Sequence, residues 1–169
     1  FSGTPYKRGI AESLRTLSRL HVYDGNYEHA LSQALESLTI LEEEKLPELM
    51  GGVLYTIATS YLTLGNLSLS LDYYLKQLEI SEAINDKQEY AMALLGLSNL
   101  YADMDDFASS LAYAEQSLAA FQVVDEPYWR ALLMNNICYS HFQLKDYDRA
   151  LDWGQRCLDY CRRYGISRI

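Results

Sequence analysis

Proline, glycine and long apolar stretches are all scarce in this chain. Its 169 residues include three Pro and nine Gly, while 49% are apolar or aromatic. This composition excludes collagen-like and low-complexity chains and predicts a folded protein. No apolar run approaches the roughly 18 residues that a membrane-spanning helix requires. We therefore expect one soluble domain or one repeat array, without membrane insertion.

Cations and cysteines are also few. Fourteen Lys and Arg face 23 Asp and Glu, which gives a net charge of -9. Nucleic-acid surfaces need clustered cations, so we expect no nucleic-acid partner. Three Cys in a chain of this size favour reduced thiols and a cytoplasmic location. Because residue 1 is Phe, we expect the chain to be part of a longer protein.

The sequence repeats itself every 40 residues. Four dipeptides set the period, and leucines after each dipeptide form two columns that hold in all four copies. The dipeptides are Gly25-Asn26, Gly65-Asn66, Asp105-Asp106 and Lys145-Asp146, and the leucine columns are Leu31, Leu71, Leu111, Leu151 and Leu38, Leu78, Leu118, Leu158. A fixed period of this length is typical of solenoid proteins.

Each copy has the spacing of two helices. Leu31, Ala34, Leu35 and Leu38 follow the period of an amphipathic helix, and no strand alternation is found. Each dipeptide separates two such segments, as a left-handed helix end and the cap of the next helix would. We predict eight helices, at about 7–24, 27–44, 48–64, 67–84, 88–104, 107–123, 128–144 and 147–164.

Small residues recur where the two helices of a hairpin should cross. Ser18, Ala58, Ser98 and Cys138 are predicted to face Ala30, Ser70, Ser110 and Ala150. Such pairs allow two backbones to approach closely. The predicted fold is an all-α, right-handed α-α superhelix of four hairpins, in a single array over 1–169 with repeats at about 7–46, 47–86, 87–126 and 127–166.

These columns resemble the tetratricopeptide repeat. A small residue is followed three positions later by Tyr61 or Tyr101, then by a Gly-Asn or Asp-Asp turn, an aromatic residue and Ala or Ser before Leu. The common repeat has 34 residues and this one has 40. The longer variety is similar to that of kinesin light chains and bacterial signalling proteins, and segment 134–138 (Met-Asn-Asn-Ile-Cys) carries the likeness. The resemblance implies a scaffold that holds a peptide, a helix or a neighbouring domain.

The resemblance also places candidate binding residues on the inner face of each first helix. The residues on this face are Arg15, Arg19, Tyr55, Thr59, Asn99, Asn135, Asn136, Tyr139 and Phe142. Asn can pair with any peptide backbone, and Tyr and Phe offer flat apolar contact. In the competing interpretation, the Asn residues satisfy helix contacts or each other.

Other groups of residues are better explained by helix packing or a solvated surface than by a ligand, metal or catalytic site. Arg15 and Arg19 share one helix face, but Thr56, Met92 and Gly96 stand where the family's carboxylate clamp would need its second half. Cys157 and Cys161 lie one turn apart without a CxxC pair, so we predict no metal site. No phosphate loop, nucleophile arrangement or cofactor fingerprint is present, and we expect neither catalysis nor a cofactor.

The sequence therefore predicts a protein-interaction module. The bound partner would be a protein or peptide, or the chain's own effector domain, within a signalling protein such as a diguanylate cyclase, histidine kinase or transcription regulator. The alternative is an architectural spacer or dimerisation arm. The last helix should also leave an apolar strip exposed, and this exposure predicts self-association through the C-terminal hairpin. The strip comprises Trp153, Cys157, Leu158, Tyr160 and Cys161.

Overall fold

The computed structural model describes residues 4–122, 124 and 126–167, and the regular elements among these residues are all helical. The helices are α1 (Thr4–Tyr23), α2 (Tyr27–Glu44), α3 (Met50–Thr63), α4 (Leu67–Ala83), α5 (Lys87–Asp103), α6 (Phe107–Ala120), α7 (Pro127–Gln143) and α8 (Tyr147–Tyr164), with a short 3-10 helix at Pro47–Leu49 before α3. Within the described residues, no helix combines the length and hydrophobicity that crossing a bilayer requires.

The predicted helices are confirmed, with three differences at their ends. The first helix begins at Thr4, three residues earlier than predicted. The third helix begins as a 3-10 turn at Pro47 and becomes α-helical at Met50. The sixth helix ends at Ala120, three residues earlier than predicted. There the Gln122 N–H bonds to the Ala119 carbonyl, a three-residue step that tightens the last turn and closes the helix. Residue 123 lies outside the described residues.

The four hairpin turns have the predicted geometry. Their first residues, Gly25, Gly65, Asp105 and Lys145, all have positive φ, between 58° and 81°. Their second residues precede the next helix, and three of these four cap it through a side-chain oxygen. Asn66 accepts a hydrogen bond from the Leu69 N–H, Asp106 from Ser109 and Asp146 from Arg149. The dipeptide therefore ends one helix and starts the next.

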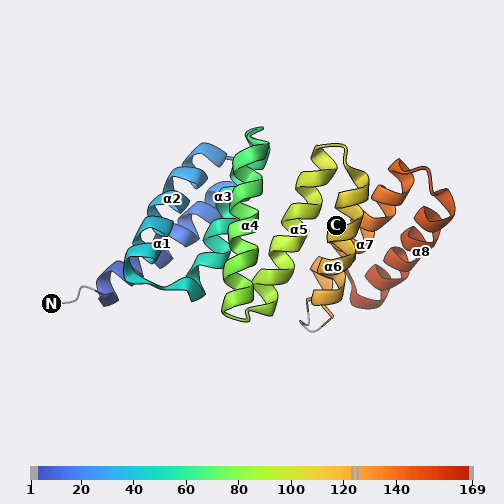
Figure 1. Ribbon diagram of the computed structural model, residues 1–169. Coiled ribbons are helices and arrows are strands. Elements are labelled where there is room, and N and C mark those ends of the chain that lie inside the picture. Colours follow the sequence, from blue (N-terminus) through green and yellow to red (C-terminus); the bar gives the residue numbers. More distant parts are fainter. Residues whose placement is uncertain (1–3, 123, 125, 168–169) are drawn as a thin grey trace. The chain divides into compact units, whose positions relative to one another are not determined.

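The chain divides after Glu89 into two compact units, which we describe separately. In the first unit, α1 and α2 form one antiparallel hairpin, α3 and α4 form the second, and α3 packs on α2 and α1 (Figure 1). Its core is lined by apolar side chains from three helices: Ala11, Ala34, Leu38, Leu41, Met50, Val53, Leu54 and Ile57.

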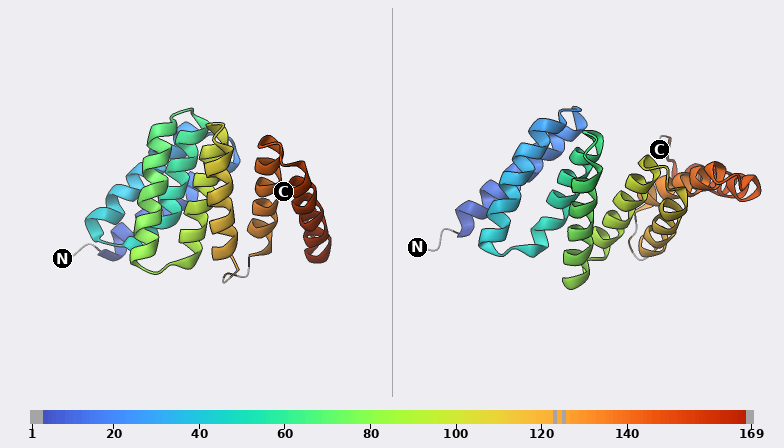
Figure 2. Two further views of the ribbon diagram at one scale, coloured as in Figure 1. Left: turned by 45° about the vertical axis from the view of Figure 1, so that its right-hand side comes forward. Right: turned by 45° about the horizontal axis from the view of Figure 1, so that its top comes forward.

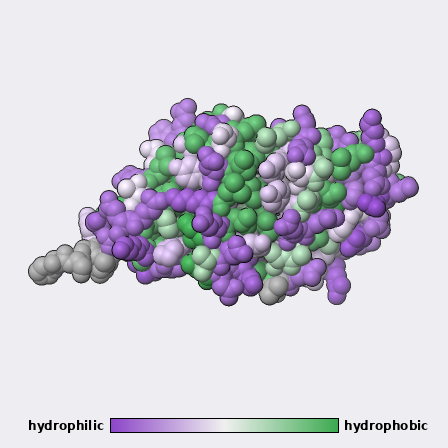
Figure 3. Space-filling view, in the orientation of Figure 1, coloured by the Kyte–Doolittle hydropathy of each residue, from purple (hydrophilic) through white to green (hydrophobic). Residues whose placement is uncertain are grey.

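The second unit repeats this packing with α7 on α6 and α8 beside α7, as Figures 1 and 2 show from three directions. Its core contains Ala91, Leu95, Ala114, Leu118, Phe121, Leu133, Met134, Ile137 and Cys157. The outer surface of α8 is mostly hydrophilic on the face in Figure 3.

Small residues lie at the helix crossings, as predicted. In the third hairpin the hydroxyls of Ser98 and Ser110 are 3.3 Å apart, and Ser110 is also 3.3 Å from Ser140. In the fourth hairpin the Cys138 thiol donates to the Ala150 carbonyl at 3.1 Å. A larger side chain at these positions would separate the backbones.

Candidate partner-binding site

The two amides of Asn99 and Asn136 meet in the second unit. Asn136 Nδ2 on α7 donates to Asn99 Oδ1 on α5 at 2.8 Å, and both residues are half-buried. For this pair, the bond agrees with the interpretation in which the Asn residues satisfy each other. Each amide keeps a second polar atom that this bond does not use, so the pair remains able to contact a partner.

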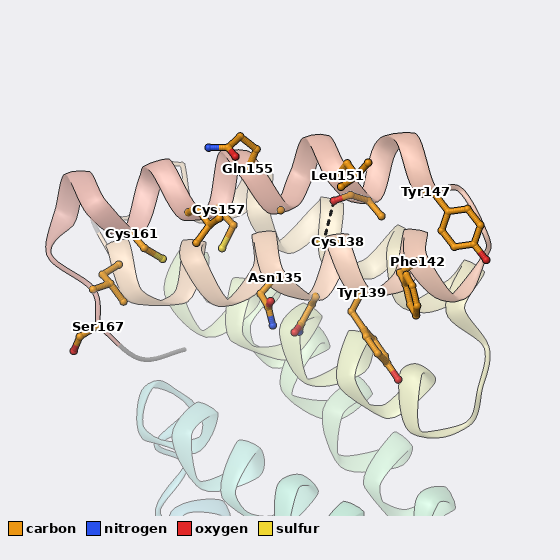
Figure 4. A pocket seen from close by; sticks show the side chains of 15 residues that line it. Asn135, Cys138, Tyr139, Phe142, Tyr147, Leu151, Gln155, Cys157, Cys161 and Ser167 are labelled. Carbon is orange, nitrogen blue, oxygen red and sulfur yellow. Dashed lines mark hydrogen bonds between the residues drawn. The ribbon is translucent and has the colours of Figure 1, made fainter.

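Asn135, Tyr139 and Phe142 are the more accessible candidates on α7. Asn135 is exposed, and the exposed fractions of Tyr139 and Phe142 are 49% and 55%. Tyr139 packs edge-on against Phe107 with ring centroids 5.9 Å apart. Figure 4 shows Asn135 and Tyr139 projecting from α7 on the side away from α8. This arrangement presents apolar surface beside an amide.

These residues form one wall of a groove of about 1170 Å³ between α7 and α8. The other wall comes from α8, and the inner-face assignment missed it. Tyr147, Leu151, Gln155 and Leu158 line this wall. In Figure 4, Tyr147 lies toward one end of α8 and Cys161 toward the other. The leucine columns contain the missing signal, because Leu151 and Leu158 are equivalent to Leu31, Leu38, Leu111 and Leu118, which pack in cores that include the following helix.

The predicted apolar strip on α8 is exposed in part only. Leu158 is 52% exposed, while Cys157 is buried and Trp153, Tyr160 and Cys161 are half-buried. Trp153 packs against the unit's core, and the Arg156 guanidinium lies over its ring at 3.9 Å. The strip is therefore narrower than predicted and includes Leu151, which is 73% exposed.

The first unit holds the other four candidates. Arg15 is half-buried and Arg19 exposed on α1, while Tyr55 and Thr59 are half-buried on α3. The Thr59 hydroxyl lies 3.0 Å from the Tyr74 hydroxyl, and the Tyr55 ring packs edge-on against Tyr74. Tyr74 thus orients both side chains of α3.

Glu89 was not predicted as part of this surface. Its carboxylate accepts a hydrogen bond from Gln77 Nε2 at 2.9 Å, and it lies directly against Gly51. Burial raises the pKa of Glu89, and the positive charges of Arg15 and Arg19 lower it only in part. The two arginines therefore lie close enough to this half-buried carboxylate to lower its pKa.

The thiols are packing groups. Cys157 Sγ donates to the Ala131 carbonyl at 3.4 Å, and burial, with the neighbouring Cys161 second, raises the Cys157 pKa to about 11. A thiol with such a pKa is protonated at neutral pH and is a poor nucleophile or ligand. In the part of the chain that the structure describes, no three His, Cys, Asp or Glu side chains gather as metal ligands would.

Two sequence profiles described as the tetratricopeptide repeat match the chain, at residues 49–122 and 130–164. Together they cover more than half of it. The chain belongs to the tetratricopeptide repeat family. No curated protein matches it in sequence.

Solved structures show the same fold at low sequence identity. The apo form of RapI matches with a TM-score of 0.85 and 17% identity over 93% of this chain and 57% of RapI. A Rap protein complexed with competence and sporulation factor matches with 0.89 and 14%, over 94% of this chain and 44% of that protein. A STAND protein with a tetratricopeptide repeat sensor from Pyrococcus horikoshii matches with 0.84 and 18%, over 93% and 24%.

This tetratricopeptide chain thus spans between a quarter and about half of the length of these three proteins. TPR-like repeats related to kinesin light chain also match, in agreement with the resemblance seen in the sequence. The likenesses show the fold class, that of an all-α helical-repeat superhelix. A tetratricopeptide repeat chain is a protein-interaction module.

Proposed function

We propose that each unit of the module binds a peptide segment of a partner protein along the inner faces of its first helices. The observation that carries the proposal is the pair of half-exposed rings of Tyr139 and Phe142 beside exposed Asn135 on one wall of the α7/α8 groove. Asn99 and Asn136 continue this surface in the second unit. In the first unit the contact residues are Arg15, Arg19, Tyr55 and Thr59.

The chemistry of these side chains suits a peptide ligand. An aromatic ring provides apolar contact at a small entropic cost, because it has only two side-chain torsions. An Asn amide both donates to and accepts from a peptide backbone, so it does not require a particular sequence. Arg15 and Arg19 add positive charge within an acidic chain and favour an acidic group in the segment.

The host protein belongs, in this proposal, to signal transduction. The STAND protein uses its tetratricopeptide repeats as a sensor, and the Rap protein was solved with a bound factor. By analogy, this chain would be the cytoplasmic regulatory region of a larger protein such as a diguanylate cyclase, histidine kinase or transcription regulator. It would bind a peptide or its own effector domain and catalyse nothing itself.

A library of random 16-residue peptides displayed on phage provides a direct test. Peptides selected on the parent chain should lose at least about tenfold in affinity on the Tyr139→Ala, Phe142→Ala variant, since buried aromatic contacts dominate such interfaces. Tyr128→Ala is the matched control, because Tyr128 is also on α7 and is 46% exposed. Selected peptides that bind the ring variant and the parent equally would contradict the proposal.

Asn135→Ala is the sharpest amide variant. Asn135 is exposed, whereas removal of Asn99 or Asn136 also breaks their mutual bond at 2.8 Å. We expect Asn135→Ala to weaken peptide binding with no change in the unfolding midpoint. Equal weakening by Tyr128→Ala would indicate nonspecific capture.

A further inference from the structure

Two of the four repeats place a pair of tyrosines at equivalent positions of the hairpin. In the second repeat the pair is Tyr61 on α3 and Tyr73 on α4, and in the third repeat it is Tyr101 on α5 and Tyr113 on α6. The first and fourth repeats hold no tyrosine at these positions, which are occupied by His21, Gln33, His141 and Trp153. Both pairs can therefore be compared directly.

The rings of Tyr101 and Tyr113 are stacked. Their centroids are 5.3 Å apart and their planes differ by 12°. The corresponding values for Tyr61 and Tyr73 are 5.7 Å and 21°. All four side chains are half-buried. Tyr101 and Tyr113 thus form the closer and more nearly parallel pair.

The direction of the two side chains brings their hydroxyl ends together. Side chains on a helix lean toward its N-terminus, so Tyr101 leans away from the turn between α5 and α6, and Tyr113 leans toward it. The rings consequently approach each other with the hydroxyl ends first. Burial, and then the charge and the hydroxyl of Tyr101, raise the pKa of the Tyr113 phenol. This influence of Tyr101 agrees with the approach of the two hydroxyl ends.

Phenol rings in this arrangement are prepared for one reaction. A one-electron oxidant takes an electron from a phenol, and the hydroxyl proton goes to solvent. The phenoxyl radical that results has unpaired electron density on the two ring carbons beside the hydroxyl-bearing carbon. In Tyr101 and Tyr113 these Cε carbons belong to the ends of the rings that approach each other. The hairpin has therefore already brought the reacting atoms together.

We propose that Tyr101 and Tyr113 are a site of oxidative cross-linking, at which a dityrosine bond joins α5 to α6. Two equivalents of a one-electron oxidant, such as a high-valent metal complex, take one electron from each phenol, and both hydroxyl protons go to solvent. The two radicals form one Cε–Cε bond. Each of these carbons then loses its hydrogen as a proton, and each oxygen regains a proton. The net change is the loss of two electrons and two protons.

The position of the pair favours a bond within one molecule. Tyr6, Tyr23 and Tyr128 are 78%, 80% and 46% exposed, and such rings can meet those of other molecules. Their coupling depends on protein concentration, whereas coupling of two rings held by the fold does not. The proposed site uses none of the peptide-binding residues. Failure of one proposal therefore leaves the other intact.

A ruthenium(III) complex, generated by light and persulfate, is the oxidant for the test. An endoproteinase that cleaves before Asp cuts at Asp103, Asp105 and Asp106, and so separates Tyr101 from Tyr113. We expect mass spectrometry to find segments 86–102 and 106–124 joined, with a mass two hydrogens below their sum. The yield per chain should stay constant as the protein is diluted.

The closest pair of tyrosine rings within one helix does not interfere with this readout. The ring centroids of Tyr160 and Tyr164 are 4.5 Å apart, but no Asp separates these two residues. A bond between them stays within one segment after cleavage, and it cannot give the joined product.

Two variants and a control assign the bond. Tyr101→Phe and Tyr113→Phe should each abolish the joined product, because Phe has no hydroxyl to oxidise. Tyr128→Phe is the control, since the Tyr128 ring packs on Trp129 at 77° and should not contribute. Circular dichroism verifies that each variant is folded. Unfolding the parent in concentrated urea should lower the yield several-fold, because the stack is then lost.

Three results would overturn the proposal. The first is absence of the joined product in a solution where added N-acetyltyrosine forms dityrosine. The second is a joined product that persists in the Tyr101→Phe variant, which would assign the bond to Tyr90, the other tyrosine of segment 86–102. The third is a yield that increases with protein concentration, or that is equal in urea, because either would show that the folded stack is not responsible.

Discussion

The two units build the same hairpin turn from different residues. In the first unit the left-handed positions are Gly25 and Gly65, which have no Cβ to strain. In the second unit they are Asp105 and Lys145, with φ of 58° and 63°. The same backbone is therefore held at a higher conformational cost in the second unit. The turn has the same left-handed geometry in both units, and the residue type at the turn changes its conformational cost.

The polar groups that lie between the helices also differ between the two units. In the first unit the half-buried carboxylate of Glu89 accepts a hydrogen bond from the amide of Gln77. The second places the hydroxyls of Ser98, Ser110 and Ser140 in a short chain. The two units therefore place different polar groups between their helices, and in each unit these groups hydrogen-bond to one another.

The largest expected effect tests whether burial alone makes equivalent leucines of one column contribute differently to the free energy of unfolding. Leu38→Ala and Leu118→Ala should each destabilise the chain by about 2–5 kcal/mol, as expected for a leucine removed from a core. Leu158→Ala should change the free energy of unfolding by less than about 1 kcal/mol, because Leu158 is 52% exposed. Urea denaturation at low protein concentration measures all three. Equal losses at Leu118 and Leu158 would contradict the open groove.

Gly51 and Gly52 provide an internal comparison in the first unit. A Cβ at Gly51 would lie 2.6 Å from the Glu89 side chain, while one at Gly52 comes no closer than 3.8 Å to it. Gly51→Ala should destabilise the chain by about 1–3 kcal/mol through overpacking. Gly52→Ala should be neutral or stabilise by up to about 1 kcal/mol, because Ala is the better helix former.

A double variant tests whether the Glu89 side chain causes the loss of stability expected for Gly51→Ala. If Glu89 causes the loss, then Gly51→Ala should cost much less in a Glu89→Ala background. Thermal unfolding of the two single variants and the double variant gives the coupling. Additive losses would show that the glycine is needed for another reason.

Substitutions at the left-handed turn residues should change stability by less, and with opposite sign in the two units. Lys145→Gly should stabilise the chain by about 0.5–1 kcal/mol, because a left-handed residue with a Cβ is strained. Asp105→Gly should gain less, since Asp tolerates this region better. Gly65→Ala should lose about 1 kcal/mol. A loss of stability on Lys145→Gly, measured by urea denaturation, would show that the Lys145 side chain has a stabilising contact.

The smallest effect is a pH dependence specific to the first unit. The pKa of Glu89 is raised in the folded chain, so the folded state retains the proton to higher pH than the unfolded state, whose Glu titrates near about 4.3. The contribution of Glu89 is most favourable below that pH and falls as pH rises through the raised pKa. Glu89→Gln should flatten this slope in urea midpoints measured from acid to neutral pH. Glu79→Gln, at an exposed position of α4, should retain the parent's slope.

The periodic columns predicted most of the fold. The turn dipeptides located four left-handed residues and three side-chain caps, because their geometry depends only on neighbouring residues. The end of the sixth helix was predicted three residues too late, since the last apolar residues continue past Ala120 while the backbone does not. Periodicity records which residues are apolar and does not record where the hydrogen bonds stop.

The candidate site was predicted less completely. The inner-face columns identified Tyr139 and Phe142 as accessible rings. They did not include the α8 wall of the groove, of which the predicted apolar strip named only Cys157, Leu158 and Cys161. The bond between Asn99 and Asn136 remained one of two alternatives. Glu89 was missed because a carboxylate in the first turn of a helix is ordinarily solvated. Its burial depends on Gln77 and Gly51, which come from two other helices.

The sequence by itself determined the helices, their turns and the columns that pack, because these follow from local backbone preference and a fixed period. Only the tertiary structure decided which members of a column are covered. Leu118 and Leu158 have the same place in the repeat, yet one is buried and the other half-exposed. The physical reason is that the burial of a leucine in a solenoid depends on the next helix, and the residue's own repeat does not contain that helix.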